Sequence, residues 1–131
     1  MRTDQRISMA MRNEPAGTCL FDETVHARLL HAARAAGSAE HAWRCLEAAH
    51  VVGQIHFKLH WQTHANMLGL AWRTCDWPEA TGQLIRLALV PVGHLSGRLP
   101  LGNPGRATVS AFKAMSVRPD LTALIDRARG N

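Results

Sequence analysis

Several features that would assign this chain to a common functional class are missing from its sequence. It has no tyrosine, no CxxC pair and only three cysteines, Cys19, Cys45 and Cys75, which lie far apart along 131 residues. A disulfide framework or a cysteine zinc site is therefore not indicated, and reduced thiols fit a cytoplasmic protein. No apolar run reaches 18 residues and residues 1–15 contain no apolar signal core, so we expect neither a membrane span nor secretion.

The positive charge is also not concentrated anywhere. The net charge is +5, and 13 of the 15 cationic side chains are arginines that are spread along the whole chain without a run of like charge. Proteins that bind nucleic acid usually gather such residues on one face or tail and add aromatic side chains on which bases stack. We therefore do not expect nucleic acid as a partner.

The apolar residues that are present predict an all-α domain. The first 20 residues have no sustained period and are interpreted as a loose N-terminal arm, and residues 21–131 as a single helical domain. Asp22, Ser38 and Asp76 are good N-caps, each directly before a helical pattern. The four tryptophans are expected in the core. Helices are predicted at about 23–36, 39–53, 55–75, 77–90 and 119–129.

These helices are expected to pair as antiparallel helical hairpins, four to five helices in all. The string from Leu68 to Ala80 is similar to tetratricopeptide hairpins, so the fold is predicted to be degenerate and tetratricopeptide-like. Prolines and glycines crowd residues 91–105, which predicts an irregular covering segment over 91–118 before the short last helix. An anion loop held by Arg98 and Arg106 is the less favoured interpretation of this segment, because no Walker A or dinucleotide motif accompanies it.

The strongest chemical signal is a cluster of histidines. Four of the eight histidines and one glutamate fall within residues 47–64. Positions three or four apart share one face of a helix, and a hairpin turning near residues 51–54 would bring two such faces together. The cluster consists of Glu47, His50, His56, His60 and His64.

This cluster predicts a metal site between two helices. Imidazoles at i and i+4 can bind one ion, and a facing Glu-x-x-His pair adds an oxygen and a nitrogen. Zn²⁺, Ni²⁺, Co²⁺, Cu²⁺ and Fe²⁺ accept such ligands. A ferritin-like di-iron site needs a second Glu-x-x-His motif, which is missing. Solvated surface histidines are the alternative interpretation, and His94 is a further candidate ligand from the Gly/Pro-rich segment.

Several strings of the chain resemble a small bacterial family, the domain of unknown function family 3703. They include Leu46 to Gln54, the pair His60 and His64, and Gly97 to Asn103 followed by Gly105 and Arg106. The resemblance covers about residues 25–125. It implies a small single-domain helical protein, of a kind often encoded beside heavy-metal resistance genes, but it brings no activity and no residue roles.

Three functions remain open from the sequence. The favoured one is a cytoplasmic protein that binds a transition-metal ion for sequestration, delivery or sensing. The second is a helical interaction module without metal, with a protein partner or a second copy of the chain. The third is a small enzyme that uses a His/Glu pair on an unknown substrate. Which metal, substrate or oligomer applies is not encoded in these patterns.

Overall fold

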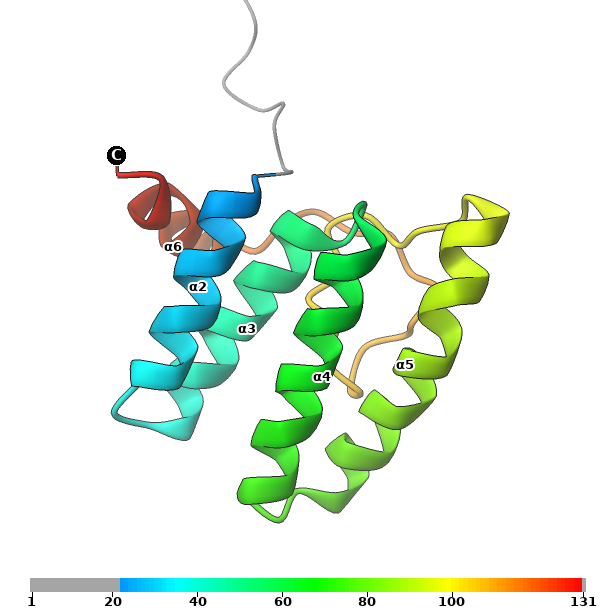
Figure 1. Cartoon of the computed structure of the whole chain (residues 1–131), viewed down its shortest axis with the longest axis horizontal. Helices are drawn as coiled ribbons and strands as arrows, with labels where there is room; N and C mark the ends of the chain where they lie inside the picture. The colour runs from blue at the N-terminus through cyan, green and yellow to red at the C-terminus, as the bar shows by residue number, and fades with distance from the viewer. Residues whose placement is uncertain (1–21, 131) are drawn as a thin grey trace, which may run out of the picture.

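The computed structural model describes residues 22–130, and these residues form helices joined by turns and one long irregular segment, with no β-strand among them. Helices α2 and α3 form one antiparallel hairpin and α4 and α5 a second, side by side (Figure 1). The predicted all-α hairpin fold is confirmed. The helices are α2 (Glu23–Ala35), α3 (Ala39–Gly53), α4 (Phe57–Arg73), α5 (Trp77–Ser96) and α6 (Pro119–Arg129).

Side-chain caps set where three of the helices, α2, α3 and α5, begin. The Asp22 carboxylate accepts hydrogen bonds from the backbone N–H groups of Thr24 and Val25, at 2.9 and 3.1 Å. Ser38 caps α3 and Asp76 caps α5 in the same way. Each such cap contributes about 1 kcal/mol by satisfying an N–H group that has no partner within its helix. The three predicted N-caps are confirmed.

Helix α5 is longer than its sequence predicts. The predicted end near residue 90 is wrong, because α5 continues through Pro91 to Ser96 and stops at Gly97, which has φ +69°. Proline inside a helix costs about 3 kcal/mol through its missing N–H. The extension carries His94 to His60 of α4. The irregular segment therefore begins at residue 97, and the predicted N-terminal arm lies outside the described residues.

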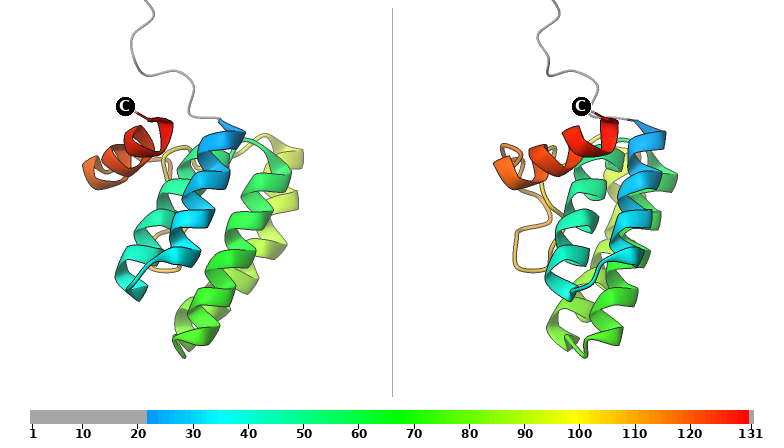
Figure 2. Two further views of the ribbon diagram at one scale, coloured as in Figure 1. Left: turned by 60° about the vertical axis from the view of Figure 1, so that its left-hand side comes forward. Right: turned by 90° about the vertical axis from the view of Figure 1, so that its left-hand side faces the viewer.

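The apolar core lies mainly within the first hairpin and beneath α6. Val25, Leu29 and Leu46 are buried there, and α6 packs over α2 and α3 with Leu121 and Ile125 (Figure 2). Because Ala48 and Ala49 of α3 are fully buried and small, neighbouring elements can approach α3 closely on both sides. No helix in the range 22–130 is long and apolar enough to cross a membrane.

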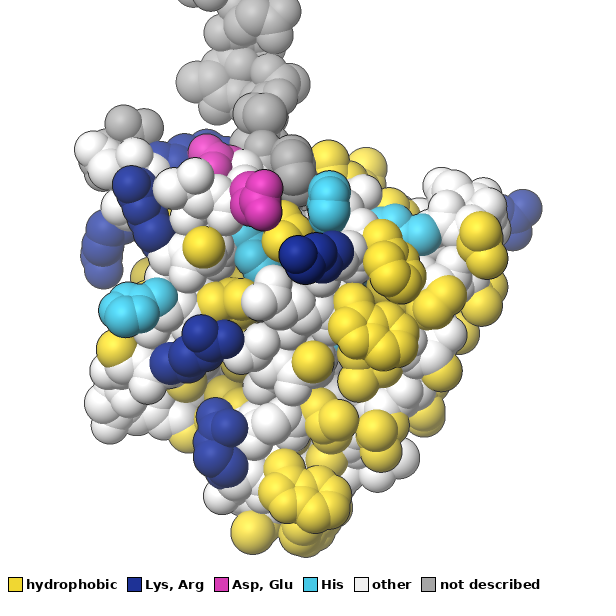
Figure 3. All heavy atoms as spheres, viewed as in Figure 1, with side chains coloured by type: hydrophobic (Ala, Val, Ile, Leu, Met, Phe, Trp, Pro, Cys, Tyr) yellow, Lys and Arg dark blue, Asp and Glu magenta, His cyan; other side chains and the backbone are white. Residues whose placement is uncertain are grey.

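The prediction that all four tryptophans are core residues is wrong for three of them. Trp43 is buried, but Trp61, Trp72 and Trp77 are 40, 62 and 52% exposed. The inward face of α4 is instead occupied by His60, Thr63, His64 and Met67 and neighbouring residues, so its aromatic stripe faces outward. Hydrophobic side chains consequently gather over α4 and α5 on the face shown in Figure 3.

Candidate metal centre

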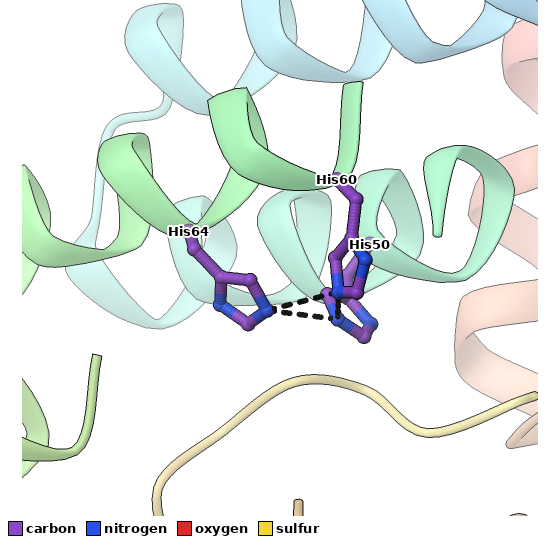
Figure 4. Close-up of side chains that lie close together, drawn as sticks. All are labelled: His50, His60 and His64. Carbon is purple, nitrogen blue, oxygen red and sulfur yellow. Dashed lines mark hydrogen bonds between the residues drawn. The ribbon is translucent and has the colours of Figure 1, made fainter. Parts of the chain in front are cut away.

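Three histidine side chains from two helices converge on one point inside the molecule. His50 comes from the last turn of α3, and His60 and His64 lie one turn apart on α4 (Figure 4). Their Nε2 atoms are 3.0 Å apart for His50 and His60, and 3.2 Å apart for the two pairs that include His64. All three side chains are buried. The three nitrogens thus form a nearly equilateral triangle.

The size of this triangle suits a transition-metal ion. With metal–nitrogen bonds of about 2.0–2.1 Å, two ligands of a tetrahedral ion lie about 3.3 Å apart, and two neighbouring ligands of an octahedral ion about 2.9 Å apart. The observed 3.0–3.2 Å falls between these values. Three histidine ligands would leave at least one position on a bound ion open to another ligand.

The outer nitrogens of two of these rings are held by groups that accept hydrogen bonds. His50 Nδ1–H donates to the backbone carbonyl of Asn103 at 2.6 Å, and His64 Nδ1–H donates to Oε1 of Gln83 at 2.7 Å. The Gln83 amide cannot be turned around, because its nitrogen donates to Glu79 and to the carbonyl of Gly105. With a proton on Nδ1, each neutral ring presents a lone pair at Nε2.

The Nε2 lone pairs of His50 and His64, 3.2 Å apart, can be stabilised by a metal ion or by an Nε2–H of neutral His60, whose Nε2 lies 3.0 and 3.2 Å from them. Protonation of a ring to an imidazolium is disfavoured, because burial, together with the other histidines, holds the pKa of His50 well below its usual 6.5. Burial likewise lowers the pKa of His60 to about 3 and that of His64 to about 4. The rings are therefore neutral near pH 7, which is the form that binds metal.

The register of the α3–α4 turn explains which histidines meet. Residues 54–56 form a turn in which the N–H of His56 donates to the carbonyl of Gly53, and α4 begins only at Phe57. His56 is thus the exposed N-cap of α4 and does not join the triangle. The two helices are offset so that His50 faces His60 and His64, rather than His56 as a hairpin turning at 51–54 would require.

Glu47 is buried on α3, the helix that carries His50, but it belongs to a different cluster of side chains. Its carboxylate forms ion pairs with Arg106 at 3.3 Å and with Arg118 at 2.8 Å. The Arg106 guanidinium also pairs with Glu79 and lies 3.8 Å over the ring of Trp43. These contacts tie the irregular segment 97–118 to α3 and α5, so Glu47 is part of the support rather than of the triangle.

The Asn103 side chain holds parts of the irregular segment 97–118 together through hydrogen bonds. The buried Asn103 amide donates to the carbonyls of Ser110 and Lys113, and its oxygen accepts the N–H of Gly105. This arrangement fixes the backbone carbonyl that Asn103 presents to His50. Gly105, at φ +85°, lies against the His50 ring, where an added Cβ would come within 2.7 Å of a ring carbon. Only glycine combines this backbone with this contact.

His94 reaches the cluster from the helical extension rather than from a loop. Its Nε2 lies 3.0 Å from Nδ1 of His60, on the side of that ring away from the triangle. It accepts the His60 Nδ1–H when His60 has the same protonation as the other two rings. His94, predicted as a ligand from a loop, therefore lies beside His60 on α5 and outside the triangle.

A cavity of about 460 Å³ opens beside the triangle, and the three histidines line it. Most of its remaining wall is apolar and comes from α5 and from the segment 97–118, with Arg86 and Arg98 as cationic members. Such volumes are typical of small-molecule sites. The apolar wall residues include Leu89, Val90, Val92, Leu99, Pro100, Ala111 and Phe112.

Comparison with known proteins places the chain in a family. Residues 21–125 match the family described as "Protein of unknown function (DUF3703)". The chain belongs to the DUF3703 family. No curated protein and no solved structure matches it. The resemblance inferred from the sequence is thereby confirmed for DUF3703, and the convergence of the three histidines rests on the geometry alone.

Sequence reasoning on this DUF3703 chain missed most of the supporting residues. Gln83, Glu79 and Arg86 are buried polar residues on α5, spaced three or four apart, and this polar stripe on an otherwise apolar helix is the signal that could have found them. Arg86 donates to the carbonyls of Arg106 and Val109, which again anchors the irregular segment.

Proposed function

We propose that this protein binds one divalent transition-metal ion through Nε2 of His50, His60 and His64. The observation that carries the proposal is the convergence of three buried imidazole nitrogens within 3.2 Å of one another. The fixed Nδ1–H donors of His50 and His64 support it, because they direct lone pairs at the same point. An all-nitrogen set suits Zn²⁺, Co²⁺, Ni²⁺, Cu²⁺ or Fe²⁺.

The open side of the triangle favours a role in which the ion is reached from outside. Closed structural zinc sites use four protein ligands, whereas three histidines leave a position for water or another ligand. We therefore rank delivery of the ion, or metal-dependent catalysis, ahead of sealed sequestration. An ion held here would act as a Lewis acid on whatever enters the adjoining cavity. The cavity lined by the same histidines is the observation that favours the enzyme as a candidate.

Metal content tests the proposal directly. The full chain, freed of metal and then dialysed against a small excess of Zn²⁺ or Co²⁺, should retain about one ion per chain, and His60→Ala should retain none. His56→Ala is the matched control, because His56 is the N-cap of the helix that carries His60 but lies outside the triangle. Equal retention by wild type and His60→Ala, or loss in the His56→Ala variant as well, contradicts the proposed ligand set.

A spectroscopic measurement keeps the test independent of variant folding. Co²⁺ bound by three histidines and one exchangeable ligand gives intense visible absorption, unlike the weak absorption of the hexahydrated ion. Titration of the metal-free wild-type chain with Co²⁺ should reach an endpoint at one equivalent. A titration with no change in the spectrum up to one equivalent, together with no Co²⁺ retained after dialysis, refutes the proposal whatever the variants do.

One observation favours an interaction function as a second candidate. Trp61, Trp72 and Trp77 expose aromatic surface on α4 and at the start of α5, where Trp72 and Trp77 pack edge to face at 5.1 Å. Exposed aromatic clusters are typical of protein contacts. Sedimentation of the wild type beside a Trp72→Glu variant tests self-association: a wild-type dimer that dissociates in the variant supports it, and monomers in both exclude a second copy as the partner.

A further inference from the structure

The cavity beside the histidine triangle has a two-part chemistry. Its floor is made by polar imidazole rings, and its walls are made by aliphatic and aromatic side chains such as Leu89, Val90 and Leu99. A wholly polar ligand would make no apolar contact with these walls, and a wholly apolar ligand would not fill the open position on a bound metal ion. The polar and apolar parts of this lining indicate a ligand with one polar end and an apolar body.

The charge around the cavity decides the sign of the polar end. The ligand triangle is neutral, so a divalent ion would bring its full charge into a buried site. Arg86, which is 8% exposed and lines the cavity, adds another positive charge near His50 and His64. Burial lowers the pKa of Arg86 from its usual value, but a guanidinium stays protonated at pH 7.

The two nearby carboxylates are engaged by other groups. Glu79 interacts electrostatically with His64 and Arg86, but its Oε1 accepts from the Gln83 amide and the Ala107 N–H and pairs with Arg106. Glu47 is engaged by Arg106 and Arg118. Among the described residues, neither carboxylate lines the cavity. A charged ion in a site of low polarity is stabilised by an anion, so the fourth ligand is expected to carry negative charge.

We propose that the cavity binds a small organic carboxylate, whose carboxylate group takes the open metal position while its apolar body lies against Leu89, Val90 and Leu99. This inference rests on the proposed metal function, because the carboxylate needs the ion to hold it. The volume of about 460 Å³ accommodates a branched aliphatic or a single-ring aromatic acid. Phe112 of the irregular segment, 79% exposed, borders the cavity and would cover such a body on its outer side.

The test uses the Co²⁺-loaded full chain and three probes that separate head from body. Phenylacetate carries both parts, acetate carries the head alone, and 2-phenylethanol carries the body alone. Phenylacetate should change the visible Co²⁺ spectrum with saturation and bind at least about tenfold more tightly than acetate, because each buried apolar group adds to affinity. The alcohol should leave the spectrum unchanged.

A pair of variants shows whether the cavity itself holds the apolar body. Ala111 lines the cavity and Ala114 is an exposed residue outside it on the same segment. Ala111→Trp should retain Co²⁺ and lose the preference for phenylacetate over acetate, whereas Ala114→Trp should retain both. Acetate and phenylacetate of equal affinity in the wild type, or equal behaviour of the two variants, overturns the inference. Failure to load Co²⁺ at all overturns the proposed function instead.

Discussion

Replacement of Gly105 by alanine should weaken metal binding by displacing the His50 ring. The new Cβ would lie 2.7, 2.8 and 3.0 Å from three atoms of the His50 ring, closer than carbon atoms normally approach. To relieve this overlap the ring must move by about 0.5 Å, which exceeds the tolerance of about 0.2 Å for a metal–ligand distance. Since His50 is one corner of the triangle, we expect affinity for Zn²⁺ to fall by about 10–100-fold.

A second glycine provides a matched control for the backbone effect. Gly97 also has a positive φ, +69°, but an added Cβ there meets no atom within 4 Å. Alanine at either position costs about 1 kcal/mol of stability through the left-handed backbone. Only alanine at 105 adds the contact with the ring, which costs about 1–3 kcal/mol more. The difference between the two variants therefore isolates the displacement of His50.

The assay combines urea unfolding of the metal-free chains with competition for Zn²⁺ against a chromophoric chelator. Gly97→Ala should bind Zn²⁺ as the wild type does, and Gly105→Ala should bind more weakly while it is still folded. If folded Gly105→Ala bound Zn²⁺ with wild-type affinity, the ring at position 50 would not be a ligand and the reasoning would fail.

Two further predictions concern the support of the rings and their protonation. Gln83→Leu removes the acceptor of the His64 Nδ1–H, so Zn²⁺ affinity should drop by about tenfold, measured by the same competition; unchanged affinity would contradict a role for this hydrogen bond. Burial lowers the pKa of His26, His60 and His64 from 6.5 to between about 3 and 4, so below pH 6.5 the unfolded chain binds protons that the folded chain does not. Stability of the metal-free protein should thus be full above pH 6.5 and fall toward pH 4, by about 2 kcal/mol per ring at pH 5; urea midpoints that do not change between pH 7.5 and 5 would refute this.

The helices of the fold could be predicted because their signals are local. Asp22, Ser38 and Asp76 each precede an amphipathic pattern, and a cap acts only on the turn that follows it. The end of α5 could not be predicted this way, because Pro91 and Gly93 locally disfavour helix. What favours the extension is tertiary: the contact between His94 and His60.

The candidate site shows the same division between local and distant information. The i, i+4 spacing predicts that His60 and His64 share a face, and the structure places them together with His50. The offset between α3 and α4 depends on the turn at 54–56, so sequence could not tell that His56 would lie outside and that Glu47 would pair with Arg106. The tryptophans of α4 face outward because the side of the helix that carries His60 and His64 faces inward.

The segment 97–118 has two roles, which conflict when a large ligand enters the cavity. The segment 97–118 walls the cavity and, through the carbonyl of Asn103, orients His50. A ligand too large for the cavity would push the segment 97–118 outward and move the Asn103 carbonyl away from the His50 ring. The proposed metal ion, which would hold the ligand, would then be bound less tightly. The size of the proposed ligand would therefore be limited by the 2.6 Å hydrogen bond between His50 and the Asn103 carbonyl as well as by the cavity walls.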